Sequence, residues 1–416
     1  MENKLLSACC LLTACWYFTA SSNAVASQLL FRDYRRSTSE GTSSTSSLAH
    51  AALLLTTVEL IVGSLIAALF WAGNRNALQN MKAPSKIINL SMSELAGGMF
   101  HSFGCFLTNC GFAFGSASLV QVVKLLEPIE TLILVALVDA VVHSRQFHIP
   151  CKKLAAVLMI VSGTSLLMTS GGISSDTNWR AVLCALISGV CMSSRNVLEK
   201  NINSKKGSGN SVFWSGLASF TRITLTGAVF ASIATAMVAM VALQHQQFPA
   251  LALFPPSRNA LKAIMYFSCY QIASIMVLSL TSAPTHSLLN VGKRIVSVIF
   301  AAHVFSNQLG ALGWTGLAIT AIGGFLYSRQ SKKTTTQTNK GTSIAEKCLA
   351  KKWHRSRGAR LIFIVGAFSV GRIIHLRNIE LGGGDISFSI TPPRDKNALS
   401  TKGGGVPMKA NNNTVT

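Results

Sequence analysis

Acidic residues are scarce in this chain of 416 residues, where 14 aspartates and glutamates stand against 37 lysines and arginines. All charged residues together make up only 12% of the sequence. Soluble domains usually carry about 25%. Because 49% of the residues are hydrophobic, the low charge excludes an ordinary soluble domain. It favours an integral membrane protein.

Motifs of catalysis and of metal binding are also missing. The patterns H-E-x-x-H, G-x-S-x-G and G-x-x-x-x-G-K-[ST] do not occur. The ten cysteines form no C-x-x-C pair and no zinc-ligand spacing. Most of them lie in apolar runs, where cysteine behaves as a small hydrophobic residue. We therefore expect no enzyme activity, no metal, no cofactor and no disulfide framework.

What the sequence does contain is a series of long apolar segments. A membrane-spanning helix needs about 20 mostly apolar residues, and ten segments meet this rule. The first begins near the N-terminus, and we expect it to be a retained helix rather than a cleaved signal peptide. The segments are, approximately, 5–30, 48–71, 93–114, 117–142, 152–170, 180–198, 212–243, 260–281, 286–304 and 308–328.

Ten spans divide into two sets of five, and an odd number in each half makes the halves inverted in the membrane. We therefore predict an all-α integral membrane domain over 1–330, with repeat halves of about 1–171 and 172–330. Inverted repeats place a substrate site near the membrane midplane. The same sequence step (293 − 124 = 169) relates Lys124 to Lys293 and His101 to Tyr270 in equivalent segments.

The region 331–416 differs in composition from the rest. It is basic, polar and rich in glycine, asparagine and threonine, and we expect it to be mostly disordered. A short apolar stretch near 361–376, broken by Arg372, is typical of an interfacial helix. Basic residues attract anionic lipid head groups, and we expect this partner rather than nucleic acid. The distribution of lysine and arginine among the loops places both termini in the cytosol.

Three cations stand out within the apolar segments: Lys124 in the fourth, and Lys293 with Arg294 in the ninth. An ionisable residue inside a span indicates a functional site by default. One alternative pairs Lys124 with Glu127, one helical turn on. For Lys293 and Arg294 the sequence offers no acidic neighbour, and the alternative is snorkelling toward a membrane edge. A phosphate bound by all three would supply the missing negative charge.

Three motifs resemble those of the triose-phosphate and plastid phosphate translocators, within the drug/metabolite transporter superfamily that also holds nucleotide-sugar transporters. "LTNCGFAFGSASLVQVVKLLEP" (107–128) is similar to a family stretch that ends in K-x-x-E-P. "KNINSKK" (200–206) and "HSLLNVGKR" (286–294) resemble two further family motifs. The resemblance covers about residues 10–328.

The resemblance implies that Lys124, Lys293 and Arg294 hold the phosphate. It also implies that Thr108 and Tyr270 contact the rest of the substrate. Cys105 stands where the family has a histidine, and His101, one turn earlier, is the candidate replacement.

We therefore expect a secondary carrier that exchanges a small phosphorylated metabolite for inorganic phosphate across an organelle membrane. The metabolites considered are triose phosphate, phosphoenolpyruvate, and pentose and hexose phosphates, and the membrane is either the plastid envelope or an endomembrane. One alternative is a nucleotide-sugar/nucleotide monophosphate antiporter of the Golgi or endoplasmic reticulum. Another is a membrane scaffold or receptor that does not transport. Glycines between Gly310 and Gly324 are typical of close helix packing within one bundle, with a homodimer contact as the alternative.

Overall fold

The computed structural model describes residues 2–38, 45–72, 91–143, 151–170, 178–204, 212–244, 257–281, 283–307 and 309–338. Within these ranges all regular structure is helical, which confirms the predicted class. The helices are α1 (Glu2–Thr38), α2 (Thr45–Ala72), α5 (Met92–Phe114), α6 (Ala117–Val123), η1 (Lys124–Leu126), α7 (Glu127–His143), α8 (Cys151–Thr169), α10 (Trp179–Ser204), α11 (Val212–Gln244), α12 (Arg258–Leu280), α13 (Ala283–Val304) and α14 (Ala311–Thr338).

The fourth apolar segment forms an interrupted helix rather than a continuous one. The α-helix α6 gives way to the single 3₁₀ turn η1, and α7 follows. Proline has no N–H, and its ring clashes with the carbonyl four residues earlier. Pro128 therefore cannot bond the carbonyl of Lys124, which accepts instead from the N–H of Glu127, three residues on. This tightened turn fixes the backbone at the position of the first predicted cation.

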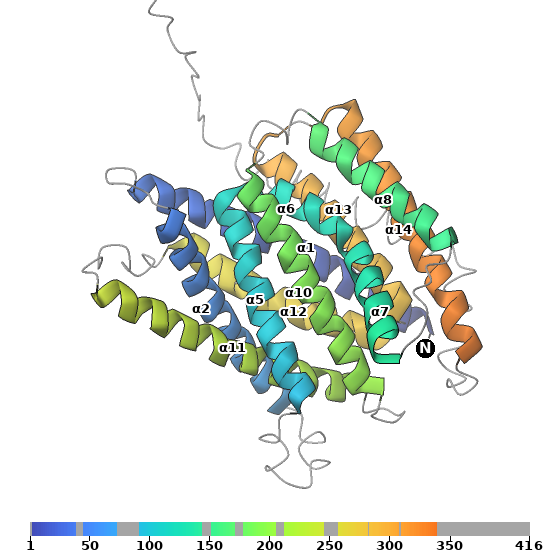
Figure 1. Ribbon diagram of the computed structural model, residues 1–416, viewed down its shortest axis with the longest axis horizontal. Coiled ribbons are helices and arrows are strands. Elements are labelled where there is room, and N and C mark those ends of the chain that lie inside the picture. Colours follow the sequence, from blue (N-terminus) through green and yellow to red (C-terminus); the bar gives the residue numbers. More distant parts are fainter. Residues whose placement is uncertain are drawn as a thin grey trace, which may run out of the picture. The chain divides into compact units, whose positions relative to one another are not determined.

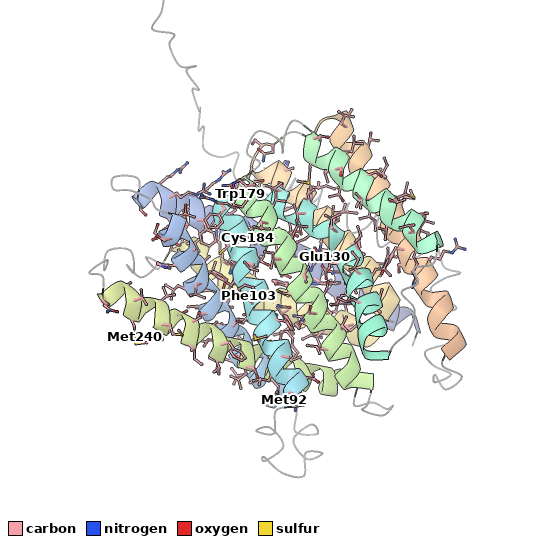
Figure 2. All side chains as sticks on the ribbon, in the orientation of Figure 1. Met92, Phe103, Glu130, Trp179, Cys184 and Met240 are labelled. Carbon is pink, nitrogen blue, oxygen red and sulfur yellow. The ribbon has the colours of Figure 1, made fainter. Side chains whose placement is uncertain are left out.

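Among the described residues, five helices are long and apolar enough to cross a membrane. They lie at Thr45–Phe70, Trp179–Leu198, Gly216–Ala242, Arg258–Leu278 and Ala311–Arg329. Large apolar side chains also point away from the protein: Phe103, Trp179 and Met240, labelled in Figure 2, are 48%, 68% and 62% exposed. Exposed apolar faces on apolar helices are what a lipid environment requires, so the chain is built as a membrane protein.

The helices pack in pairs drawn from both parts of the chain. The most extensive pairings join α8 with α14, α5 with α10, and α1 with α12. Next come α2 with α11 and α5 with α11. In Figure 1 α8 lies beside α14, and α2 crosses α11. The interrupted helix contacts α10 and α13. These contacts bring the fourth and ninth predicted segments together.

The described helices agree with the ten predicted segments in position and extend beyond several of them. One helix passes the predicted domain boundary at residue 330: α14 continues to Thr338, into the region predicted to be mostly disordered. A hydropathy window detects only the apolar part of a helix, and polar residues can continue the helix past it. Residues 339–416, with the predicted interfacial helix near 361–376, lie outside the described residues, as do most of the inter-helix loops.

Glycines bring α8 and α14 into close backbone contact. A Cβ atom on Gly316 would lie 2.6 Å from the carbonyl oxygen of Gly163 and 2.8 Å from the nitrogen of Leu167. A Cβ on Gly324 would come within 2.9 Å of Val291 in α13. Gly310, by contrast, would meet nothing within 4 Å. Gly316 and Gly324 therefore serve the packing of helices within the chain.

We predict that Gly316→Ala destabilises the protein by about 1–3 kcal/mol, because the new methyl group would overlap backbone atoms that cannot rotate away. Gly310→Ala is the matched control, and its melting temperature should equal that of the wild type. The measurement is thermal unfolding of the purified protein in detergent. Equal melting temperatures for the two variants would contradict the α8–α14 contact.

Candidate functional site

Lys124 lies at the junction of α6 and η1 and is buried. Its ammonium group donates a hydrogen bond to the hydroxyl oxygen of Thr108 in α5. Thr108 in turn donates to the carbonyl of Gly104 (2.8 Å) and lies 2.7 Å from the hydroxyl of Ser188 in α10. The hydrogen-bond partner of Lys124 is therefore neutral, and the described residues contain no ion pair between Lys124 and Glu127, which the sequence offered as an alternative.

Glu127 pairs instead with Arg294 of α13, and the ion pair is buried. Asn290, one turn before Arg294, places its amide nitrogen 3.3 Å from both carboxylate oxygens. One terminal nitrogen of the Arg294 guanidinium bonds Glu127, and the other donates to the side-chain oxygen of Gln121 in α6 (3.3 Å). The expectation that Arg294 has no acidic partner was thus wrong. Its partner is distant in sequence and comes from a different helix.

Lys293 forms no ion pair within the described part of the chain. Its ammonium nitrogen lies 5.1 Å from the ring centroid of Trp16 in α1 and 5.7 Å from that of Tyr270 in α12. Such distances allow a cation–π attraction, which is weaker than a desolvated ion pair. Lys293 is therefore held by aromatic faces and carries no direct counter-charge.

The three cations share one electrostatic environment. Arg294 interacts with both lysines, and Lys124 interacts with Lys293. The carboxylate in direct contact with a member of this group belongs to Glu127. Among the described residues, one carboxylate is thus in direct contact with a group of three cationic side chains. The arrangement can bind an anion, since a desolvated cation without a partner is costly and a mobile anion removes that cost.

Glu130 lies one turn beyond Glu127 on α7, where Figure 2 labels it. Its carboxylate interacts with Lys124 through space. One oxygen, Oε2, is buried without a hydrogen-bond partner among the described residues. Glu130 is thus a second acid near the site, without a direct contact to any of its cations.

The remaining predicted residues lie on α5 and α12. Tyr270 packs edge-on against Phe267, with ring centroids 5.4 Å apart. His101 is fully buried, and its Nδ1 lies 3.8 Å from the sulfur of Cys105. The same Nδ1 accepts a hydrogen bond from Arg195 of α10 (3.0 Å). The structure therefore brings His101 and Cys105 together, and Cys105 lies one turn before Thr108 on the same helix.

Sequence reasoning missed Arg195. This guanidinium interacts electrostatically with Cys105, Tyr270 and Lys293, so it adds a fourth cation on the α10 side. The signal was available, because Arg195 interrupts the apolar segment 180–198 just as Lys124 interrupts its own. Gln121 and Asn290 carried no such signal, because neutral amides in apolar segments do not stand out until their partners are known.

Cationic side chains that lie inside apolar helices, and that two distant parts of one chain bring together, are typical of a membrane transporter. The sequence model of the Triose-phosphate Transporter family matches residues 8–328. The chain belongs to this family, as the three motifs predicted.

Relatives that are named as plastid proteins share modest sequence identity with this chain. A triose phosphate/phosphate translocator of non-green plastids from Brassica oleracea is 27% identical over 297 residues, covering 67% of this chain and 66% of the relative. Phosphoenolpyruvate/phosphate translocator 1 of Arabidopsis thaliana is 26% identical over 283 residues, covering 67% and 65%. The match thus spans slightly less than two thirds of either plastid relative. Solute carrier family 35 member E4 of Rattus norvegicus is 33% identical over 92 residues, which are 21% of this chain and 26% of that protein.

We predict that the ion pair and the lysine contribute unequally to stability. Glu127→Gln would leave the guanidinium of Arg294 buried without its carboxylate and should cost about 3–5 kcal/mol. Lys124→Gln replaces a cation whose hydrogen-bond partner is neutral, and it should cost less. The double variant Glu127→Gln/Arg294→Gln should lose less stability than the two single losses added together. Thermal unfolding in detergent measures these three variants and the single variant Arg294→Gln. Strictly additive losses from Glu127→Gln and Arg294→Gln would contradict the Glu127–Arg294 ion pair.

Proposed function

We propose that this protein is a secondary carrier that exchanges a small phosphorylated metabolite for inorganic phosphate. The observation that carries the proposal is the meeting of three cationic side chains, Lys124, Lys293 and Arg294, at one place, with the carboxylate of Glu127 in contact with one of them. Family membership supports it, and so do plastid relatives that are named as phosphate translocators.

The donor set suits a phosphate group. An arginine offers a planar pair of N–H donors, and a lysine offers a compact point charge. Arg294 already directs its two terminal nitrogens to different acceptors, Glu127 and Gln121. A phosphate can replace these acceptors with charged oxygens while also reaching both lysines. The substrate would thus take over the role of Glu127, which serves as internal counter-charge in the absence of ligand.

Ten membrane spans arranged as two inverted repeats are part of the proposal. The pairing of the helices supports this arrangement, because exchanging the first five helical segments with the last five maps the most extensive pairings onto one another or onto themselves. The pair α1–α12 becomes α10–α5, and both pairs are extensive. The pairs α2–α11 and α8–α14 each map onto themselves. A site between such repeats opens to alternate sides when one repeat rocks against the other.

The location of the carrier in the cell and the binding of the organic part of the substrate belong to the same proposal. We place the carrier in an organelle membrane with both termini in the cytosol, on the basis of the basic loops and tail. His101, Cys105 and Arg195 form the side of the site nearest α5 and α10. We assign this side to the part of the metabolite that is not the transported phosphoryl group.

We predict that Lys293→Gln and Arg294→Lys each lower phosphate-dependent uptake about tenfold or more. Removing a hydrogen bond to a charged group costs about 1.5–3 kcal/mol, and a lysine cannot make both contacts of Arg294. The measurement is uptake of radiolabelled triose phosphate, phosphoenolpyruvate, pentose and hexose phosphates and nucleotide sugars into proteoliposomes loaded with phosphate. Arg329→Gln, which removes an exposed cation of α14, is the control and should transport normally. Wild-type uptake by both site variants would refute the proposal.

We also predict obligatory exchange. Returning through the closed state without an anion would leave three cations with one carboxylate in a medium of low dielectric constant. Each 1.4 kcal/mol of such a penalty slows the step about tenfold. Liposomes loaded with labelled phosphate should release it slowly into phosphate-free buffer and rapidly once external phosphate is added. Equal rates in the two buffers would show that the empty carrier returns freely.

A further inference from the structure

Trp16 of α1 occupies a position that neither the cation pattern nor the family motifs draw attention to. Its side chain is only 1% exposed. It belongs to a buried cluster made by helices α1, α12 and α13, whose other members are Tyr17, Ala273, Val277, Leu289 and Val296. An indole in such a cluster would ordinarily be a core residue. Its polar atom and its two neighbours indicate otherwise.

The indole ring contacts two polar groups of α13. The ammonium nitrogen of Lys293 lies 5.1 Å from its centroid. The imidazole of His286 stacks on it, with centroids 4.9 Å apart and an angle of 14° between the planes. His286 is itself oriented by a hydroxyl, since its Nε2 lies 3.3 Å from the oxygen of Ser274 in α12. Trp16 is therefore held in a fixed orientation beside the cation that has no carboxylate partner.

The indole nitrogen Nε1 is buried and has no acceptor among the described residues. Indole N–H groups in protein interiors normally find a partner, because a buried donor without one is destabilising. In the described part of the chain, a donor without an acceptor thus lies next to a cation without a carboxylate in contact, and an oxyanion could serve both.

We propose that Trp16 is a substrate-contacting residue whose indole N–H donates a hydrogen bond to an oxygen of the anion that Lys293 binds. The inference rests on the proposed function and adds a neutral donor from α1 to it. Lys293 lies over the ring that carries Nε1, so a tetrahedral phosphate bound beside the ring would offer each donor a different oxygen. In the absence of the anion the ring face holds the ammonium group, and when phosphate binds the N–H gains its acceptor.

The sharpest test changes one atom. Benzothienylalanine at position 16 keeps the fused ring and replaces the N–H by sulfur, which cannot donate. Trp16→Phe also removes the donor and keeps an aromatic face for Lys293. We expect each change to weaken the binding of inorganic phosphate about tenfold. The affinity is measured from the phosphate-dependent rise in melting temperature of the full-length protein.

Trp314→Phe is the matched control, because Trp314 lies on α14 and is 52% exposed. It should bind phosphate as the wild type does. Wild-type affinity in the benzothienylalanine protein would overturn the role of Trp16 and leave the proposed function standing. If Trp16→Phe fails to fold, the benzothienylalanine protein decides alone. An absence of phosphate binding by the wild-type protein would overturn the proposed function itself.

Discussion

The buried carboxylate of Glu127 against the guanidinium of Arg294 is the contact on which the candidate site depends. It joins the interrupted fourth helix to α13, so it fixes the relative position of the two helices that carry the cations. It also sets the charge of the site, since two further cations stand near it without a carboxylate in contact. The site is therefore held together by a carboxylate that belongs to the protein, and in the proposed function an external anion completes it.

The backbone prepares this arrangement. Pro128 interrupts the helical hydrogen bonds beside Lys124, and the resulting 3₁₀ turn separates α6 from α7. Lys124 then points to the hydroxyl of Thr108, while Glu127 reaches across to α13. The turn leaves the two side chains near each other along the chain, and their partners come from different neighbouring helices, Thr108 from α5 and Arg294 from α13. The different partners of Lys124 and Glu127 keep positive charge available for a ligand.

Much of the fold could be predicted from the sequence, because apolar length alone locates helices in a membrane protein. The predicted segments lie within or close to the observed helices, and the cations of the fourth and ninth segments do meet. The pairing of Glu127 could not be predicted. Sequence distance favoured Lys124, only three residues away, over Arg294, which is brought near by the packing of α13 against η1. Trp16 was missed for the same reason, because its neighbours come from α12 and α13.

Equilibrium binding of radiolabelled phosphate to the purified wild-type protein tests most directly whether an external anion completes the cation cluster. We predict saturable binding of about one phosphate per chain, displaced by a phosphorylated metabolite and unaffected by an equal concentration of chloride. The same binding should be lost in Lys293→Gln, which removes the cation without a carboxylate partner. Phosphate binding that does not saturate, or that persists unchanged in Lys293→Gln, would contradict the assignment of the site.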